Sequence, residues 1–144
     1  MTEFHVAIGD ISTFTKTVSE SDVYLFAGIT GELSPNHVNQ SYMEKSVWGK
    51  RMVHGALLIG FVSTASTLAI AHTRDDPKET PVAVGFDKTR FLAPVFLGDT
   101  VTVSYKIAAI DMKRRRSTAE VRITNQTDAL VGITQHLLQW VPNE

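Results

Sequence analysis

The stretch HGALLIGFVSTASTLAIAHT, residues 54–73, contains no Asp, Glu, Lys or Arg, and it decides the fold class. A segment of this length is long enough to cross a bilayer as a helix. Hydroxyl side chains occupy its middle, however, and Gly60 interrupts its apolar part. A helix that is apolar on most sides is also what the centre of a globular domain buries. We therefore predict a long buried helix over 54–72 and no insertion into a membrane.

The sequence that follows is rich in strand-forming residues. After an expected polar loop at 73–81, four segments combine β-branched and aromatic residues with partial alternation, at 82–96, 100–112, 117–124 and 130–141. Their short connections predict an antiparallel meander. A curved antiparallel sheet supplies the apolar cover that the helix needs, so the predicted fold class is α+β, in a single domain over 1–144. Such a sheet leaves an open edge or face, which predicts a dimer.

Shorter elements are expected before the central helix. Residues 11–18, ISTFTKTV, are β-branched and aromatic in character and predict a strand. Ser19 and Asp22 resemble a capping box, and apolar residues then follow at helical spacing, which predicts a helix over 20–28. The segment NQSYMEKSVW, residues 39–48, predicts a further short helix.

Composition excludes several classes of function. A length of 144 residues suits one domain. The formal net charge of −1 gives no electrostatic footprint for nucleic acid. The absence of cysteine removes disulfides, thiolate catalysis and cysteine-based zinc sites. Residues 1–10, MTEFHVAIGD, have neither the basic start nor the apolar run of a secretory signal, so a cytoplasmic protein is expected.

The stretch TGELSPNHVN, residues 30–39, places the carboxylate of Glu32 near the imidazole of His37 in the sequence. The Gly, Ser, Pro and Asn residues around them build loops. Loops held by a rigid scaffold are where catalytic groups tend to lie. The alternative is a surface loop that happens to contain polar residues.

The segment RMVHGALL contains a second candidate, at the start of the central helix. Gly55 falls in the first turn, where backbone N–H groups have no acceptor within the helix and can stabilise developing negative charge. A glycine also lets a substrate carbonyl approach the backbone closely. The alternative is that His54 merely caps the helix and Gly55 serves packing.

Two long stretches carry a family resemblance. Residues 24–58, YLFAGITGELSPNHVNQSYMEKSVWGKRMVHGALL, resemble the hydratase motif of the MaoC-like family, which includes the R-specific enoyl-CoA hydratases. Residues 88–103, KTRFLAPVFLGDTVTV, resemble the Phe-x-x-Pro-Val-x-x-Gly-Asp-Thr segment of the same family. The resemblance covers nearly the whole chain, and it implies the hot-dog fold, in which an antiparallel sheet wraps a long helix, usually in a dimer.

The resemblance also implies a lyase chemistry of fatty acid metabolism, the hydration of trans-2-enoyl thioesters or its reversal. Glu32 takes the place of the family aspartate and, with His37, would hold the water. Gly55 stands where the oxyanion donor does, and Ser63 where a supporting hydroxyl often lies. Ser34 replaces the family asparagine, and the longer Glu32 side chain carries one extra methylene. No metal or redox cofactor is implied, and coenzyme A or acyl carrier protein enters only as part of the substrate.

Two other functions remain as alternatives. The same fold could hydrolyse thioesters, or form a non-catalytic acyl-thioester-binding subunit of a heterodimer.

No pair of histidines has metal-ligand spacing with a carboxylate, so no metal is predicted. The run KRRR, residues 113–116, predicts an exposed turn, with attraction of substrate phosphates or of an acidic carrier protein as the alternative.

Overall fold

The computed structural model describes residues 4–75 and 78–144 of the chain. Five strands form one antiparallel sheet in the order β1-β3-β4-β5-β2. The strands are β1 (Ile11–Thr17), β2 (Glu79–Phe91), β3 (Thr100–Asp111), β4 (Arg116–Thr124) and β5 (Leu130–Pro142). The helices are α1 (Glu20–Thr30), α2 (Pro35–Val38), α3 (Gln40–Met43) and α4 (Gly55–Ala69), followed by one 3-10 turn, η1 (Ala71–Thr73). This confirms the α+β class predicted from the sequence.

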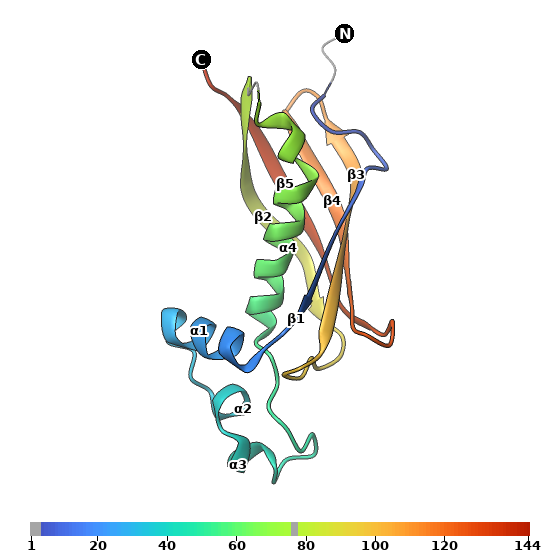
Figure 1. Cartoon of the computed structure of the whole chain (residues 1–144). Helices are drawn as coiled ribbons and strands as arrows, with labels where there is room; N and C mark the ends of the chain where they lie inside the picture. The colour runs from blue at the N-terminus through green and yellow to red at the C-terminus, as the bar shows by residue number, and fades with distance from the viewer. Residues whose placement is uncertain (1–3, 76–77) are drawn as a thin grey trace.

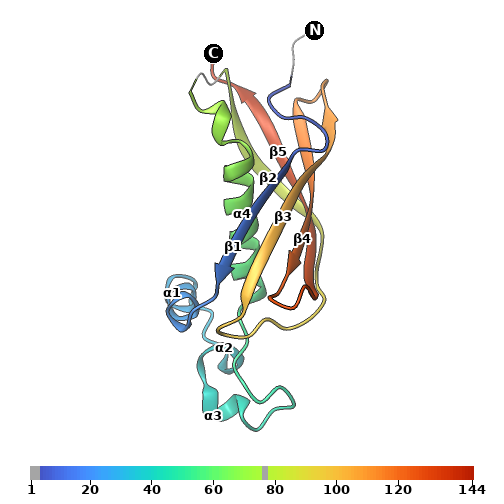
Figure 2. The same cartoon turned by 45° about the vertical axis from the view of Figure 1, so that its right-hand side comes forward.

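The central helix α4 lies along the concave side of the curved sheet, closest to β1 and β3 (Figures 1 and 2). One side of α4 is buried, and its buried residues are Leu58, Phe61, Val62, Ala65 and Ser66. They pack on inward-facing side chains of the sheet, among them Val103, Tyr105 and Val121. The α-helix ends at Ala69, earlier than predicted, because the backbone tightens into the η1 turn. The structure thus confirms the wrapped central helix.

The predicted meander is only partly right. Strands β3, β4 and β5 follow one another as a meander, but β2 pairs with β5 and not with β3. Residues 92–99 between β2 and β3 are long enough to cross from one side of the sheet to the other. Within this connection Phe96 forms an isolated β-bridge with Met52, which joins the connection to the segment before α4. Sequence adjacency predicted a hairpin where the chain makes a crossover.

Helices α1, α2 and α3 gather at one end of the sheet, at the end where α4 begins (Figure 1). The capping box is present, since Asp22 N–H donates to the Ser19 hydroxyl and Ser19 N–H donates to the Asp22 carboxylate. Gly31 ends α1 in the left-handed conformation with φ 78°. The short helix predicted over 39–48 is confined to α3, whose first turn is capped by the Asn39 side chain.

Parts of two sequence predictions fall outside the described residues. Residues 76 and 77 of the loop expected at 73–81 lie there, as do residues 1–3 of the N-terminal stretch. Strand β2 begins at Glu79, inside the expected loop. Within the described ranges, no helix is both long and apolar enough to cross a membrane.

Candidate active site

Glu32 and His37 meet at the end of the sheet where α4 begins. Glu32 follows the left-handed Gly31, and His37 lies in the short helix α2, which Pro35 starts. The carboxylate Oε2 of Glu32 lies 3.1 Å from Nε2 of His37. The histidine is buried, whereas nearly half of the glutamate side chain is exposed. The structure therefore brings together the acid and the base that the sequence predicted as a pair.

The orientation of His37 is set by the backbone of Met52. Nδ1 of His37 lies 2.7 Å from the Met52 carbonyl oxygen, which can only accept, so Nδ1 carries a proton. The other nitrogen, Nε2, then faces the Glu32 carboxylate over 3.1 Å. A carboxylate and an imidazole this close can share the task of taking a proton from a bound water and delivering it elsewhere.

Ser34 fixes the second carboxylate oxygen of Glu32. The Ser34 N–H donates to Oε1 over 2.8 Å. Hydrogen bonds from Ser34, first its side chain and then its backbone, lower the pKa of Glu32, and the nearby histidines add to the effect. The carboxylate is thus held ionised at neutral pH, as a proton acceptor must be.

His54 lies behind this pair, as the N-cap residue of α4. Its ring stacks on the His37 ring, with centroids 3.8 Å apart and planes 22° from parallel, and Phe26 packs on it from another side. Nε2 of His54 lies 3.1 Å from the backbone carbonyl of Glu32 and donates to it. Its Nδ1 is buried and has no hydrogen-bond partner among the residues that the structure describes. Its side chain makes no cap hydrogen bond. Through the bond to the Glu32 carbonyl it instead joins the start of α4 to the loop that carries Glu32.

Gly55 opens α4 directly after His54, and its backbone is closely approached by Phe91. A Cβ atom at Gly55 would lie 2.6 Å from Cε2 of Phe91, closer than real Cβ contacts come. The N-terminus of α4 therefore combines the backbone N–H groups of a first helical turn with a position that only glycine fits in this arrangement. The Phe91 ring, which is half-exposed, forms a wall beside it.

Ser63 lies on an exposed part of α4. At about 1.5 Å per residue, it is roughly 12 Å along the helix axis from Gly55. None of its side-chain contacts joins it to Glu32 or His37 in the structure. The supporting role that the resemblance implies for Ser63 stays a prediction.

Three potential metal ligands converge at this site, contrary to the sequence argument about spacing. One carboxylate oxygen of Glu32 and one ring nitrogen each of His37 and His54 lie within 4.8 Å of one another. The two histidines are distant in sequence, but Met52 N–H donates to the Asn36 carbonyl over 2.8 Å and joins their segments. The spacing argument was therefore wrong, while the absence of a metal cofactor remains a prediction.

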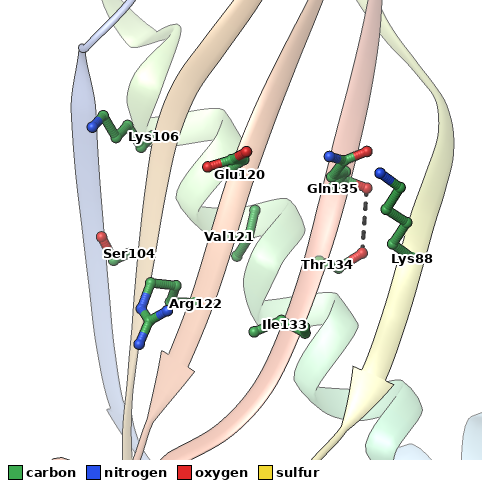
Figure 3. A pocket seen from close by; sticks show the side chains of 9 residues that line it. All are labelled: Lys88, Ser104, Lys106, Glu120, Val121, Arg122, Ile133, Thr134 and Gln135. Atoms are coloured by element: carbon green, nitrogen blue, oxygen red, sulfur yellow. Dashed lines mark hydrogen bonds between the residues drawn. The ribbon is translucent and has the colours of Figure 1, made fainter.

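A hollow lies elsewhere, on the face of the sheet turned away from α4 (Figure 3). It measures about 380 Å³, and Lys88, Lys106, Glu120 and Arg122 are among the residues that line it. It holds neither a histidine nor a helix terminus, so it offers no counterpart to the Glu32 site. Lys113, Arg114 and Arg115 lie in the turn between β3 and β4, at the opposite end of the sheet from α2 (Figure 1), and Arg116 begins β4. The prediction of an exposed turn holds for Lys113 and Arg114, whereas Arg115 is partly buried and pairs with Glu79.

Sequence reasoning missed some residues that shape the site. Met52 acts through its carbonyl, a group that every residue carries, so no side-chain pattern could have indicated it. Phe26 packs on His54, a contact that the helical spacing of apolar residues in α1 does not indicate. Phe91, far from Gly55 in the sequence, lies against it and so belongs to the surroundings of the start of α4.

Comparison with known proteins identifies similar chains. A family model described as a MaoC like domain matches residues 7–130. An (R)-specific enoyl-CoA hydratase of Rhodospirillum rubrum is 38% identical over 103 residues, which are 71% of this chain and 66% of that protein. A 3-hydroxybutyryl-CoA dehydratase of Methylorubrum extorquens is 34% identical over 111 residues, 76% of this chain and 66% of that protein. The match thus spans just under two thirds of the length of both relatives.

The fold has solved counterparts. The structure of an (R)-hydratase from A. caviae involved in PHA biosynthesis superimposes with a TM-score of 0.80. The two chains are 23% identical, and the superposition covers 93% of this chain and 96% of the other. At this identity the likeness concerns the fold alone, and it agrees with a hot-dog arrangement of sheet and helix.

Proposed function

The chain belongs to the MaoC-like domain family, and from this premise we propose that it adds water to trans-2-enoyl thioesters to give (3R)-3-hydroxyacyl thioesters, or catalyses the reverse dehydration. This activity is that of a hydro-lyase, in agreement with the names of the two relatives. The observation that carries the proposal is the 3.1 Å contact of Glu32 with His37, beside the N-terminus of α4.

The acid–base pair would activate the water. Water is a poor nucleophile at neutral pH, so a base must remove its proton while its oxygen bonds to C3 of the enoyl group. Glu32 is suited to hold the water because Ser34 keeps its carboxylate ionised and fixed. His37 is suited to exchange the proton because its Nδ1 is anchored on Met52 and its Nε2 faces Glu32. One proton of the water ends on C2, and the hydroxyl ends on C3.

The N-terminus of α4 would stabilise the charge that this addition creates. As the oxygen bonds to C3, electron density moves through the conjugated system to the thioester carbonyl oxygen. The backbone N–H of Gly55 is the proposed donor to that oxygen, with the helix dipole adding to its effect. A single donor of this kind is worth about 3 kcal/mol in the transition state. The Phe91 ring would wall the carbonyl position on one side.

The remaining parts of the proposal concern the surroundings of the reaction. The chemistry needs no metal or redox cofactor, and the acyl carrier is coenzyme A or acyl carrier protein. We propose a homodimer, because β2 is an edge strand that carries exposed apolar residues. The cytoplasm is the proposed location.

The test is hydration of crotonyl-CoA, followed by the loss of enoyl-thioester absorbance. Wild type is compared with Glu32→Gln and His37→Ala, and with Glu120→Gln as a matched acid-to-amide control on the far face of the sheet. We expect turnover by wild type and by Glu120→Gln, and a loss of at least about 100-fold in both site variants. A coupled (3R)-specific dehydrogenase reports the configuration of the product.

Two other outcomes would redirect the proposal. Release of free thiol without formation of a hydroxyacyl thioester would assign thioester hydrolysis to the site. No turnover by wild type, together with activity in Glu32→Asp, would identify a binding subunit that has lost the family's carboxylate geometry. Equal activity in wild type and Glu32→Gln would overturn the role given to the pair.

A further inference from the structure

The Glu32, His37 and His54 cluster has the composition of a zinc site. Two imidazoles and one carboxylate are a known set of zinc ligands, with the fourth position left to water. Their candidate atoms lie within 4.8 Å of one another, and the Glu32 to His37 contact is 3.1 Å. Bonds of about 2.0–2.1 Å at tetrahedral angles would place ligand atoms about 3.4 Å apart. The longest distance between two ligand atoms therefore has to shorten by little more than an ångström.

The surroundings of the two histidines match those of metal ligands. A histidine that binds a metal usually donates its other ring N–H to a carbonyl or carboxylate, which fixes the tautomer. His37 does so through Nδ1 to Met52, and His54 through Nε2 to the Glu32 backbone. Each neutral ring thus keeps one nitrogen that can offer a lone pair to a metal, and on His37 that nitrogen, Nε2, already faces the Glu32 carboxylate. On His54 that nitrogen is Nδ1, which is buried and has no partner among the described residues.

We propose that this cluster binds one Zn²⁺ ion per chain, in competition with the catalytic water, so that zinc is a reversible inhibitor of the enzyme. The side chain of Glu32 is the mobile member, because nearly half of it is exposed while both rings are buried. An ion held by Glu32 and His37 occupies both atoms that the proposed reaction needs for its water.

The stacking of the His37 and His54 rings indicates that zinc would bind as a reversible inhibitor and not as a permanently bound cofactor. The two rings lie stacked, 22° from parallel, so their in-plane lone pairs do not converge until the rings tilt apart. That tilt gives up the stacking contact and weakens the site relative to a preformed one. Zinc therefore binds reversibly and is removed by a chelator, while the hydration itself proceeds without metal.

The experiment is calorimetric titration of the full chain with zinc chloride. His54→Gln and Glu32→Gln each remove one ligand, and His72→Gln is the control, a histidine outside the cluster whose Nε2 contacts the His5 carbonyl. Circular dichroism establishes that each variant is folded, and the exposed Glu32 remains informative if the buried His54 variant does not fold. Loss of an outer-sphere partner alone costs 10- to 100-fold in metal affinity, so loss of a direct ligand should cost at least about 100-fold.

The expected result is one zinc per chain in wild type and His72→Gln, and binding at least about 100-fold weaker in the two ligand variants. No binding by wild type, or wild-type affinity in both ligand variants, would overturn the inference. A second arm, inhibition of crotonyl-CoA hydration by zinc with recovery on chelation, rests on the proposed function. If wild type lacks hydratase activity, the proposed function fails and the titration still decides the zinc site.

Discussion

The close contact between Gly55 and Phe91 makes the start of α4 sensitive to a single methyl group. In Gly55→Ala the new Cβ would meet the Phe91 ring at 2.6 Å, so the ring has to swing away. Because the ring is half-exposed, it can move, and the free energy of unfolding should change by less than about 1 kcal/mol. Activity should fall by about 100-fold, since a displacement of about 1 Å at a reacting group has that effect. Urea unfolding and crotonyl-CoA kinetics measure the two quantities.

The double variant Gly55→Ala, Phe91→Leu separates the ring from the backbone. If the displaced ring blocks the carbonyl position, the smaller leucine should restore part of the activity. If the methyl group itself blocks the approach to the backbone N–H, the double variant should remain as slow as Gly55→Ala. Unchanged kcat/KM in Gly55→Ala would contradict the placement of the thioester at this position.

A buried histidine outside the active site should make folding depend on pH. His136 is almost fully buried, and its Nδ1 lies within hydrogen-bond distance of the Tyr105 hydroxyl, at 2.8 Å. Burial lowers the pKa of His136 from 6.5 to about 4. The unfolded chain then binds more protons than the folded chain between these values, so stability is complete above pH 6.5 and falls as the pH drops toward 4. The loss is at most about 3 kcal/mol.

Urea unfolding at several pH values between 7 and 4 checks this expectation. His136→Gln keeps an acceptor for Tyr105 but cannot be protonated in this range, so its stability should vary less with pH than that of wild type. Carboxylates with lowered pKa values, such as Glu79 and Glu32, add acid sensitivity to both proteins at still lower pH. Parallel pH dependences in the two proteins would contradict a role for His136.

At the residue scale, sequence could identify the site only where side-chain chemistry marks it. Glu32, His37 and Gly55 could be named as candidates because a carboxylate, an imidazole and a glycine at a helix start carry distinct chemistry, and their roles stay predictions. The anchor of His37 was not, because a backbone carbonyl such as that of Met52 leaves no trace in the sequence. The stacking of His54 on His37 depends on a long-range backbone contact, and separation along the chain gave the wrong answer about possible metal ligands.

Among the elements, α1 depends on its N-terminal cap. The Ser19 hydroxyl accepts a hydrogen bond from the Asp22 N–H, and the Ser19 N–H donates one to the Asp22 carboxylate. Ser19→Ala should lower the free energy of unfolding by about 1 kcal/mol. Ser21→Ala is the matched control, because its hydroxyl contacts Ser19 and caps nothing itself, and it should cost less than about 0.5 kcal/mol. Equal unfolding midpoints for the two variants would argue against the cap as the source of stability.

The elements themselves were largely predictable, while their connections were not. Strand β1, helix α4 and strands β3 to β5 follow from apolar patterning, which acts locally. The end of β2 was placed too late, since the predicted segment 82–96 includes the crossover that leaves the sheet after Phe91. Which strand neighbours β2 depends on how the sheet wraps α4, and this is decided by burial over the whole molecule. Local turn chemistry cannot supply that information.

For the whole molecule, the exposed edge of β2 leads to a prediction about assembly. Among the described residues, this strand pairs only with β5, and Val82, Val84 and Phe86 on it are each more than a third exposed. An unpaired edge with apolar side chains favours pairing with another chain, and a two-fold dimer places the same edge on both sides. Val84→Lys puts a charge on that edge and should convert the proposed dimer to monomer.

Light scattering after size exclusion gives the mass of each species. Ile11→Lys is the control, because it places the same charge on an exposed residue of β1, the strand at the other edge of the sheet. We expect dimers for wild type and Ile11→Lys, and monomers for Val84→Lys. If Ile11→Lys dissociates the dimer and Val84→Lys does not, the contact runs through β1 instead, where α4 already lies alongside. A wild-type monomer at every concentration tested would mean that the apolar edge of β2 serves a different partner.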